Sequence, residues 1–188
     1  TAASIAAAYG LSLRQLYRNN PILGGRPDIY PGETLVISYD QEPEGELTAN
    51  GYAYPFIPSS LLSSVLPYLT YLTPFTYGFT PQGALVELDD GALLAAAAEA
   101  GTAPLMHLST LTESGGFSNE LAHTVLTDGA VQNRLAASLL ETIQQKGYRG
   151  LDVDFEFVYP EDASAYAAFI ARMRESLSPL GLPVFVAL

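Results

Sequence analysis

From Leu47 onward, apolar strand-like runs alternate with helical stretches along the chain. This alternation is typical of β/α units around a parallel sheet, because a helix carries the chain back between neighbouring parallel strands. Helices are expected at residues 133–146, which Gly147 ends, and from Pro160 onward. Five strands are expected, at residues 50–56, 71–79, 103–109, 150–158 and 183–188. The sequence therefore predicts an α/β fold for residues 47–188.

The number of expected strands limits how much of a barrel this region can form. A closed (β/α)8 TIM barrel needs eight strands and about 250 residues. Residues 47–188 supply the first five strands, and no further helix or strand follows the last of them. We therefore predict a partial TIM barrel, with the sequence stopping inside the domain.

Two regions of different composition precede the barrel. Residues 1–39 hold a short helical pattern, turn residues and a β-rich run at 34–38. Residues 40–46 carry four acids, a proline and a glycine, without apolar periodicity. Such a composition is typical of a solvated linker. We expect an acidic linker that tethers the two regions without a rigid interface.

The charge and composition of the chain exclude several partners. The formal net charge is −12, and the 8 Lys and Arg residues are too few and too scattered to neutralise a row of phosphates. Nucleic acid is therefore not expected as a partner. No apolar run is long enough to span a membrane. The lack of cysteine excludes disulfides and thiolate metal sites, and 2 histidines are too few for a histidine-rich site.

Acidic and apolar residues alternate in the segment 150–158. Alternate residues of a strand point to the same side, so Asp152, Asp154 and Glu156 are expected on one face. A half-buried surface strand would show the same alternation, with its acids in solvent. The apolar flanks and the following helix favour a strand that is covered on both faces.

Three carboxyl groups in a covered row cannot all ionise at low cost. Like charges in poor solvent raise at least one pKa and leave a proton shared among the groups. A carboxyl group that stays protonated near neutral pH can protonate the leaving oxygen of a glycosidic bond. The pattern therefore favours a catalytic role over a structural one.

The same segment resembles the signature of glycoside hydrolase family 18, D-x-x-D-x-D-x-E on the fourth strand of a TIM barrel. Asp152, Asp154 and Glu156 match its last three acids, and Arg149 stands in place of the first. The resemblance implies a retaining, substrate-assisted mechanism, in which the sugar's acetamido oxygen attacks the anomeric carbon. It implies that Glu156 protonates the glycosidic oxygen, that Asp154 orients the acetamido group, and that Asp152 tunes Asp154. Neither a metal nor another cofactor is implied.

Two further segments resemble the branch of this family found in bacterial spore and cell-wall hydrolases. Residues 50–54 look like its first barrel strand, and residues 104–106 with 115–118 look like its third strand and following loop. The resemblance implies an N-acetylglucosamine-containing glycan as substrate, either peptidoglycan, such as that of the spore cortex, or a chitin-like chain. It also implies an extracellular location, at the cell wall or the spore surface.

Residues 4–37 resemble the LysM module, a small glycan-binding unit with strand-helix-helix-strand (βααβ) order. The opening strand of that family is absent, and Thr1 is the first residue. The resemblance implies a truncated LysM module over residues 1–39, with a closing strand at 35–37. The matching residues are Ser4 to Ala6, Tyr9 to Leu13, Leu16, Asn20 and Pro21, Ile29 to Gly32, and Leu35 to Ile37.

Aromatic residues near the expected strand ends are candidates for stacking on pyranose rings. They are Tyr52, Tyr54, Phe75, Tyr77 and Phe117. Packing inside the barrel explains each of them equally well. We interpret His107 and His123 as packing or surface residues.

Three functional hypotheses follow from these features. The first is an active glycosidase, and the second is a catalytically inactive, lectin-like protein that binds chitin or peptidoglycan. The third, a structural coat protein, explains neither the acidic segment nor the N-terminal one. Lectin-like members of the family usually lose the terminal acid, whereas Glu156 is present, which favours the enzyme.

Overall fold

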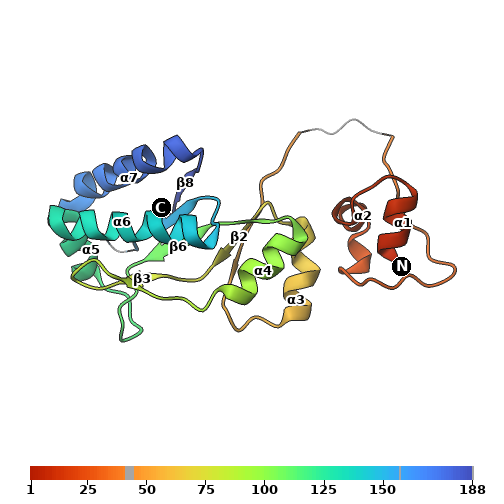
Figure 1. Cartoon of the computed structure of the whole chain (residues 1–188), viewed down its shortest axis with the longest axis horizontal. Coiled ribbons are helices and arrows are strands. Elements are labelled where there is room, and N and C mark those ends of the chain that lie inside the picture. Colours follow the sequence, from red (N-terminus) through yellow and green to blue (C-terminus); the bar gives the residue numbers. More distant parts are fainter. Residues whose placement is uncertain (41–44, 157, 188) are drawn as a thin grey trace.

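The computed structural model describes residues 1–40, 45–156 and 158–187. Residues 41–44, most of the expected linker, lie outside the described part, as do Phe157 and Leu188 at the ends of two expected strands. Figure 1 shows a region of strands and helices, coloured from orange to blue, and a smaller helical region at the N-terminus.

The strands after residue 49 form a parallel arrangement. Strand β1 pairs with β2, β2 with β5, β6 with β7, and β7 with β8, and all four pairs are parallel. A single residue, Leu105, separates β5 from β6. The strands are β1 (Asn50–Ala53), β2 (Tyr71–Pro74), β5 (Ala103–Pro104), β6 (Met106–Ser109), β7 (Leu151–Asp154) and β8 (Val184–Val186). Because they follow one another in chain order, the predicted parallel α/β arrangement is confirmed.

The observed strands are shorter than the expected ones. The expected strand at 71–79 divides into β2 and β3 (Gly78–Phe79), and β3 pairs antiparallel with β4 (Leu85–Val86). This hairpin was not predicted from the alternation. A Cβ atom on Gly78 would lie 2.0 Å from the carbonyl oxygen of Leu111, so the close approach requires glycine.

The acidic strand also ends earlier than expected. Strand β7 stops at Asp154, because its partner β6 stops at Ser109, the residue paired with Asp154. Glu156 lies in the turn that follows. The expected row of three acids on one strand is therefore two acids on the strand and a third at its carboxyl end.

Helices separate the strands and provide most of the core. Figure 1 shows α5, α6 and α7 together beside the strands β6 to β8. The main core lies between them and includes Leu108, Leu135, Val153, Phe155 and Phe169, all buried. The helices are α3 (Ser59–Val65), α4 (Gly91–Ala100), α5 (Asn119–Thr127), α6 (Gly129–Lys146) and α7 (Ala163–Leu177), with the short 3-10 helices η2 (Leu66–Tyr68), η3 (Pro160–Asp162) and η4 (Ser178–Leu180).

Helix α6 shows how local sequence sets an element's ends. The side chain of Asp128 accepts hydrogen bonds from the backbone N–H groups of Ala130 and Val131, at 2.8 and 3.1 Å, and so begins the helix before the expected residue 133. Gly147 ends it in a left-handed conformation, with φ of 75°, as predicted.

The N-terminal region has a small core of its own. Helices α1 (Ala2–Ala8) and α2 (Leu13–Asn19) and the 3-10 helix η1 (Pro21–Leu23) bury Ala2, Ala6, Leu16, Tyr17 and Leu23. The structure assigns no strand to the described residues 34–38, contrary to the prediction. No neighbouring strand offers a ladder there, and the Asn20 side chain instead bonds both backbone groups of Val36, at 2.7 and 2.8 Å.

The N-terminal region also contacts the α/β region, which differs from the expected tether without an interface. The Arg14 guanidinium on α2 donates hydrogen bonds to the carbonyl oxygens of Leu69, Ala100 and Gly101. The hydroxyl of Tyr68 donates to the Tyr17 carbonyl at 2.9 Å. The acceptors are backbone carbonyl oxygens, which every residue has, so no apolar or charge pattern in the sequence predicts these bonds.

Candidate active site

The pairing of β6 with β7 brings polar side chains together inside a largely apolar sheet. His107 is paired with Asp152, and Ser109 with Asp154. Because alternate residues of a strand share a face, both acids of β7 lie on the same side as these two residues of β6. Leu108 and Val153, on the opposite side, belong to the main core.

A hydrogen bond across the sheet shows that this side is concave. The Tyr52 hydroxyl on β1 donates to the Oδ2 atom of Asp152 on β7, at 2.7 Å. Strands β1 and β7 belong to two different three-stranded sheets, β1-β2-β5 and β6-β7-β8, which adjoin where Leu105 connects β5 to β6. Tyr52 can reach Asp152 because the two sheets together form a curved surface, and the two side chains meet on its concave side.

The two acids of β7 have raised pKa values for related reasons. Asp152 is 2% exposed, and this burial raises its pKa, although the hydrogen bond from Tyr52 acts in the opposite direction. Burial is also the main cause that raises the pKa of Asp154, followed by the negative charges of Glu156 and Asp152. The sequence-based expectation of raised carboxyl pKa values is met at these two positions.

Glu156 differs from the other two acids in its surroundings. It is exposed, in the turn after β7, and close enough to Asp154 for its charge to raise the pKa of that group. The structure therefore brings the three predicted acids together at the carboxyl end of β7, with the outermost one open to solvent. The carboxyl ends of parallel strands are where sites lie in α/β folds.

His107 was not predicted to belong to this site. It is a packing residue, as interpreted from the sequence, but it packs inside the site, fully buried, with its Nε2 atom 3.5 Å from Asp154 Oδ2. Its Nδ1 atom lies 2.6 Å from Thr76 Oγ1, and its ring packs on Phe75 with 4.8 Å between centroids. Burial lowers the pKa of His107 to about 4, so the ring is neutral near neutral pH. A lone polar residue between Met106 and Leu108 was the available signal.

His123 lies elsewhere, on α5. Its Nδ1 atom is 2.7 Å from the Asp162 carboxylate, and its side chain is 47% exposed. The interpretation as a surface residue holds for His123.

Aromatic side chains form a hollow beside the acids. The hollow measures about 280 Å³ and is lined by Tyr52, Ala53, Tyr54, Phe75 and Asp154. Phe117 continues the aromatic surface, since its ring centroid lies 6.4 Å from that of Phe75 and its side chain is 57% exposed. Four of the five predicted aromatic residues therefore lie around the acids of β7.

One predicted aromatic residue lies away from the hollow, and one that was not predicted lies beside it. Tyr77 is buried among the α-helices and bonds Asp90 and Lys146, so it does not face the hollow. The break between β2 and β3 changes which side its side chain faces. Phe56 was missed, although its ring stacks on Tyr54 at 5.0 Å and is 81% exposed.

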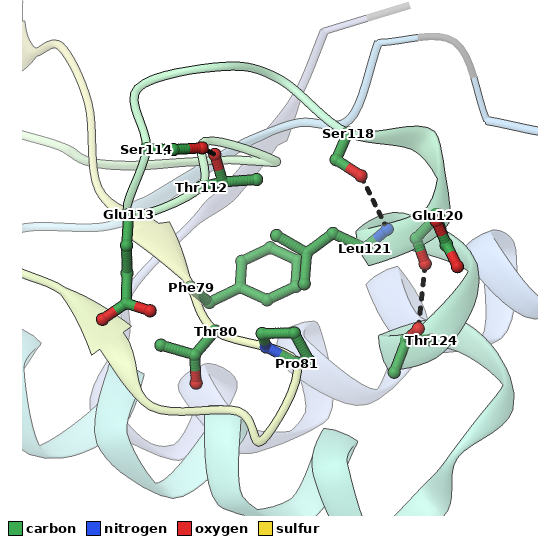
Figure 2. A pocket seen from close by; sticks show the side chains of 10 residues that line it. All are labelled: Phe79, Thr80, Pro81, Thr112, Glu113, Ser114, Ser118, Glu120, Leu121 and Thr124. Carbon is green, nitrogen blue, oxygen red and sulfur yellow. Dashed lines mark hydrogen bonds between the residues drawn. The ribbon is translucent and has the colours of Figure 1, made fainter.

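A second hollow of about 380 Å³ lies between the β3–β4 hairpin, the β6–α5 loop and α5. Figure 2 shows Glu113 and Glu120 on opposite sides of it, with Phe79 and Leu121 between them. The Ser118 hydroxyl is already engaged, because it accepts the backbone N–H of Leu121 at 3.1 Å. None of the β7 acids lines this hollow.

The described part of the chain shows neither a metal-ligand cluster nor a membrane-spanning helix. Among those residues, no group of three or more His, Asp or Glu side chains is arranged to hold a metal ion. None of the described helices combines the length and apolar character needed to cross a bilayer.

No model of a known protein family matches the chain. The cortical fragment-lytic enzyme of Bacillus cereus is 35% identical over 114 residues, which are 61% of this chain and 26% of that enzyme. The chain thus aligns with a minor part of this relative.

Solved structures extend the comparison to the whole chain. The spore cortex-lytic enzyme SleL of Bacillus cereus matches 100% of this chain and 44% of its own, with a TM-score of 0.70 and 27% identity. A chitinase from Chromobacterium violaceum matches 74% of this chain and 45% of its own, with a TM-score of 0.66 and 23% identity. The mixed α/β fold is therefore shared with glycan-cleaving enzymes, and the chain spans less than half the length of these relatives.

Proposed function

We propose that the full-length protein is a glycosidase that cleaves an N-acetylglucosamine-containing glycan, with Glu156 as its general acid. The observation that carries this proposal is the set of acids at the carboxyl end of β7, where two raised pKa values adjoin an exposed glutamate. The aromatic hollow beside them suits a pyranose ring, whose apolar face can stack on tyrosine or phenylalanine. Relatives that include cortex-lytic enzymes and a chitinase support the same reaction class.

The proposed mechanism is retaining and substrate-assisted. Glu156 protonates the glycosidic oxygen while the acetamido oxygen of the bound sugar attacks the anomeric carbon, and Glu156 then activates the water that opens the oxazolinium intermediate. Asp154 lies next to Glu156 and orients the acetamido group. Asp152, fixed by Tyr52 at 2.7 Å, tunes Asp154 from the buried side. No metal or other cofactor takes part.

Residues 47–188 are proposed to be the first five strands of a (β/α)8 TIM barrel. The chain-order parallel pairing and the hydrogen bond from β1 to β7 across the concave side support a curved, barrel-like sheet. Residues 1–39 are proposed to belong to a LysM module, supported by two capped helices over a small core of their own. Residues 40–46 would then connect a glycan-binding unit to a glycan-cleaving one.

The proposed substrate is peptidoglycan, such as that of the spore cortex, or a chitin-like chain. The proposed location is therefore extracellular, at the cell wall or the spore surface. The names of the cortex-lytic relatives support both proposals. The chain has 20 acidic and only 8 basic residues, and this negative balance suits a substrate without negative phosphates.

The test is hydrolysis of a chromogenic N-acetylglucosaminide and of cortex peptidoglycan by the full-length protein. Glu156→Gln should lower turnover by roughly 10²–10⁴-fold with little change in glycan binding, because the amide keeps the shape but has no acidic proton. Glu161→Gln, the same change at an exposed acid of η3, is the matched control and should leave turnover unchanged. Glycan binding without turnover by the wild type would support the lectin-like alternative, and near-normal turnover of Glu156→Gln would contradict the assignment.

A further inference from the structure

One buried polar atom in the site has no partner. His107 Nε2 is fully buried and makes no hydrogen bond within the described part of the chain. The ring is held between two aromatic side chains, with Phe75 tilted against it and Tyr52 edge-on, at 4.8 and 5.5 Å between centroids. An unsatisfied buried polar atom is costly and calls for a physical explanation.

The other nitrogen of the ring is held by a chain of hydroxyl groups. Thr76 Oγ1 lies 2.6 Å from His107 Nδ1, and it can donate its single proton to Ser109 Oγ at 3.0 Å or to the Tyr77 carbonyl at 3.1 Å. The Ser109 hydroxyl can donate to the same carbonyl at 3.4 Å. When Thr76 gives its proton to an oxygen, its lone pair remains for an N–H on His107 Nδ1. A neutral imidazole carries one proton, so Nε2 is then a bare acceptor.

The Asp154 carboxyl, next to His107, also lacks a hydrogen-bond donor and a cation among the described residues. Asp152 receives the Tyr52 hydroxyl at 2.7 Å, whereas no hydrogen bond to the Asp154 carboxyl is found in the residues that the structure describes. Among those residues, neither acid forms an ion pair with a lysine or arginine. Of two neighbouring acids without a cation, the one with a donor is the better carboxylate, and the other is the better place for a proton.

One proton can satisfy both the unpaired His107 Nε2 atom and the unpaired Asp154 carboxyl group. We propose that His107 is a positioning residue for Asp154: its Nδ1–H is donated to Thr76, and its bare Nε2 accepts the proton that the Asp154 carboxyl carries in the glycan-free protein. The two atoms, Nε2 and Oδ2, are 3.5 Å apart, and a small rotation of the Asp154 carboxyl closes them to hydrogen-bond distance. The neutral state of His107, favoured by its burial, leaves the lone pair free.

This arrangement gives His107 a role in orienting the site, and that consequence rests on the proposed function. In the glycan-free protein the Asp154 carboxyl is held toward β6, and a bound acetamido group has to draw it away. The titratable groups that face His107 are Asp152 and Asp154 from β7 and Tyr52 from β1. Near neutral pH none of them supplies a competing cation.

The direct test is ¹⁵N NMR of the imidazole rings in the full-length protein, without glycan, near neutral pH. His107→Gln identifies the signals that belong to His107, because these are the signals that the variant loses. A proton on Nδ1 with Nε2 unprotonated supports the proposal. A proton on Nε2, or a charged ring, overturns it. This readout needs no turnover, so it stands even if the proposed glycosidase activity is not found.

The kinetic test uses His107→Phe and His107→Gln with the chromogenic substrate. Phenylalanine keeps the packing but removes the acceptor, so kcat should fall by roughly three- to tenfold with KM nearly unchanged. In a profile of kcat against pH, the acid-side limb should move to lower pH. Loss of the acceptor destabilises protonated Asp154 and so lowers its pKa. Glutamine offers an oxygen near the Nε2 position and should recover part of kcat. A shift of that limb to higher pH would mean that His107 donates to Asp154, and a kcat of His107→Phe equal to that of the wild type would indicate a role in packing alone; either result contradicts the proposal.

Discussion

The chain buries carboxyl groups in two places, and the two differ in what surrounds them. Asp90, which precedes α4, is 2% exposed and receives Lys146 at 2.9 Å and the Tyr148 hydroxyl at 2.5 Å, in addition to the Tyr77 hydroxyl. Burial raises its pKa, but the hydrogen bonds from Tyr148, Tyr77 and Lys146 and the charge of Lys146 outweigh burial and lower it. Asp90 is therefore a carboxylate held by its surroundings.

Asp152 is equally buried, but it receives a neutral hydroxyl and no cation in the described part of the chain. Asp154 receives no hydrogen bond from the residues that the structure describes, and the pKa values of both acids are raised. The difference shows that burial alone does not decide the state of an acid. A cation and several donors lower the pKa of Asp90, whereas Asp152 and Asp154 lack a cation in the described residues and keep raised pKa values.

The largest expected effect concerns the two acids of β7, Asp152 and Asp154. In the full-length protein, Asp154→Asn should reduce turnover by about 10²-fold or more, because the amide cannot supply the charge that stabilises the developing oxazolinium. Asp152→Asn acts one step removed and should be milder. Steady-state rates on the chromogenic substrate measure both, and a larger loss in Asp152→Asn would mean that the order of the two acids is reversed.

The next effect concerns the structural side. Lys146→Met leaves the buried Asp90 without its cation and should lower the free energy of unfolding by about 2 kcal/mol, below the full cost of breaking a buried pair because Lys146 is partly exposed. Urea unfolding measures the change. Asp89→Asn, at the exposed neighbouring acid, should have almost no effect. Equal stability of Lys146→Met and the wild type would show that the two hydroxyl groups suffice to hold Asp90.

The pH dependence of stability should have opposite signs at the two sites. The lowered pKa of Asp90 gives stability that is present above the ordinary carboxyl pKa of about 3.9 and is lost as pH falls through the folded value. The raised pKa of Asp152 gives stability that is present below that ordinary value and is lost as pH rises through the folded value.

Thermal unfolding between about pH 3 and pH 7 can separate these signs. The advantage of the wild type over Asp90→Asn should shrink as pH falls, whereas its stability relative to Asp152→Asn should improve as pH falls. Changes of the same sign in both comparisons would remove the distinction between the two sites.

The smallest expected effect comes from Tyr52, the neutral counterpart of Lys146. Tyr52→Phe removes the hydrogen bond to Asp152 and should lower kcat/KM by roughly three- to tenfold. Loss of that donor should also raise the pKa of Asp152 further, which a pH profile of the reaction would show. Tyr54→Phe, which keeps the aromatic surface of the same hollow, is the comparison variant.

Local patterns predicted those parts of the structure that depend on local causes. The alternation of strand and helix runs predicted the parallel α/β arrangement, and Gly147 predicted the end of α6. Strand lengths were overestimated, because a strand lasts only as long as its partner, and β6 ends at Ser109. The β-rich run at 34–38 has the composition of a strand, but in the described residues the Asn20 side chain takes the place of a ladder.

By itself, the sequence determined the common face of Asp152 and Asp154, because the two-residue period of a strand fixes side-chain direction. Only the tertiary structure decided which neighbours those acids have. Tyr52 reaches Asp152 across 100 residues of sequence, and His107 enters the site through the pairing of β6 with β7. Tyr77, only two residues after Phe75, faces Asp90 on the other side. The pKa of a carboxyl group depends on the charges and donors that surround it in space, and the curvature of the sheet brings these groups together.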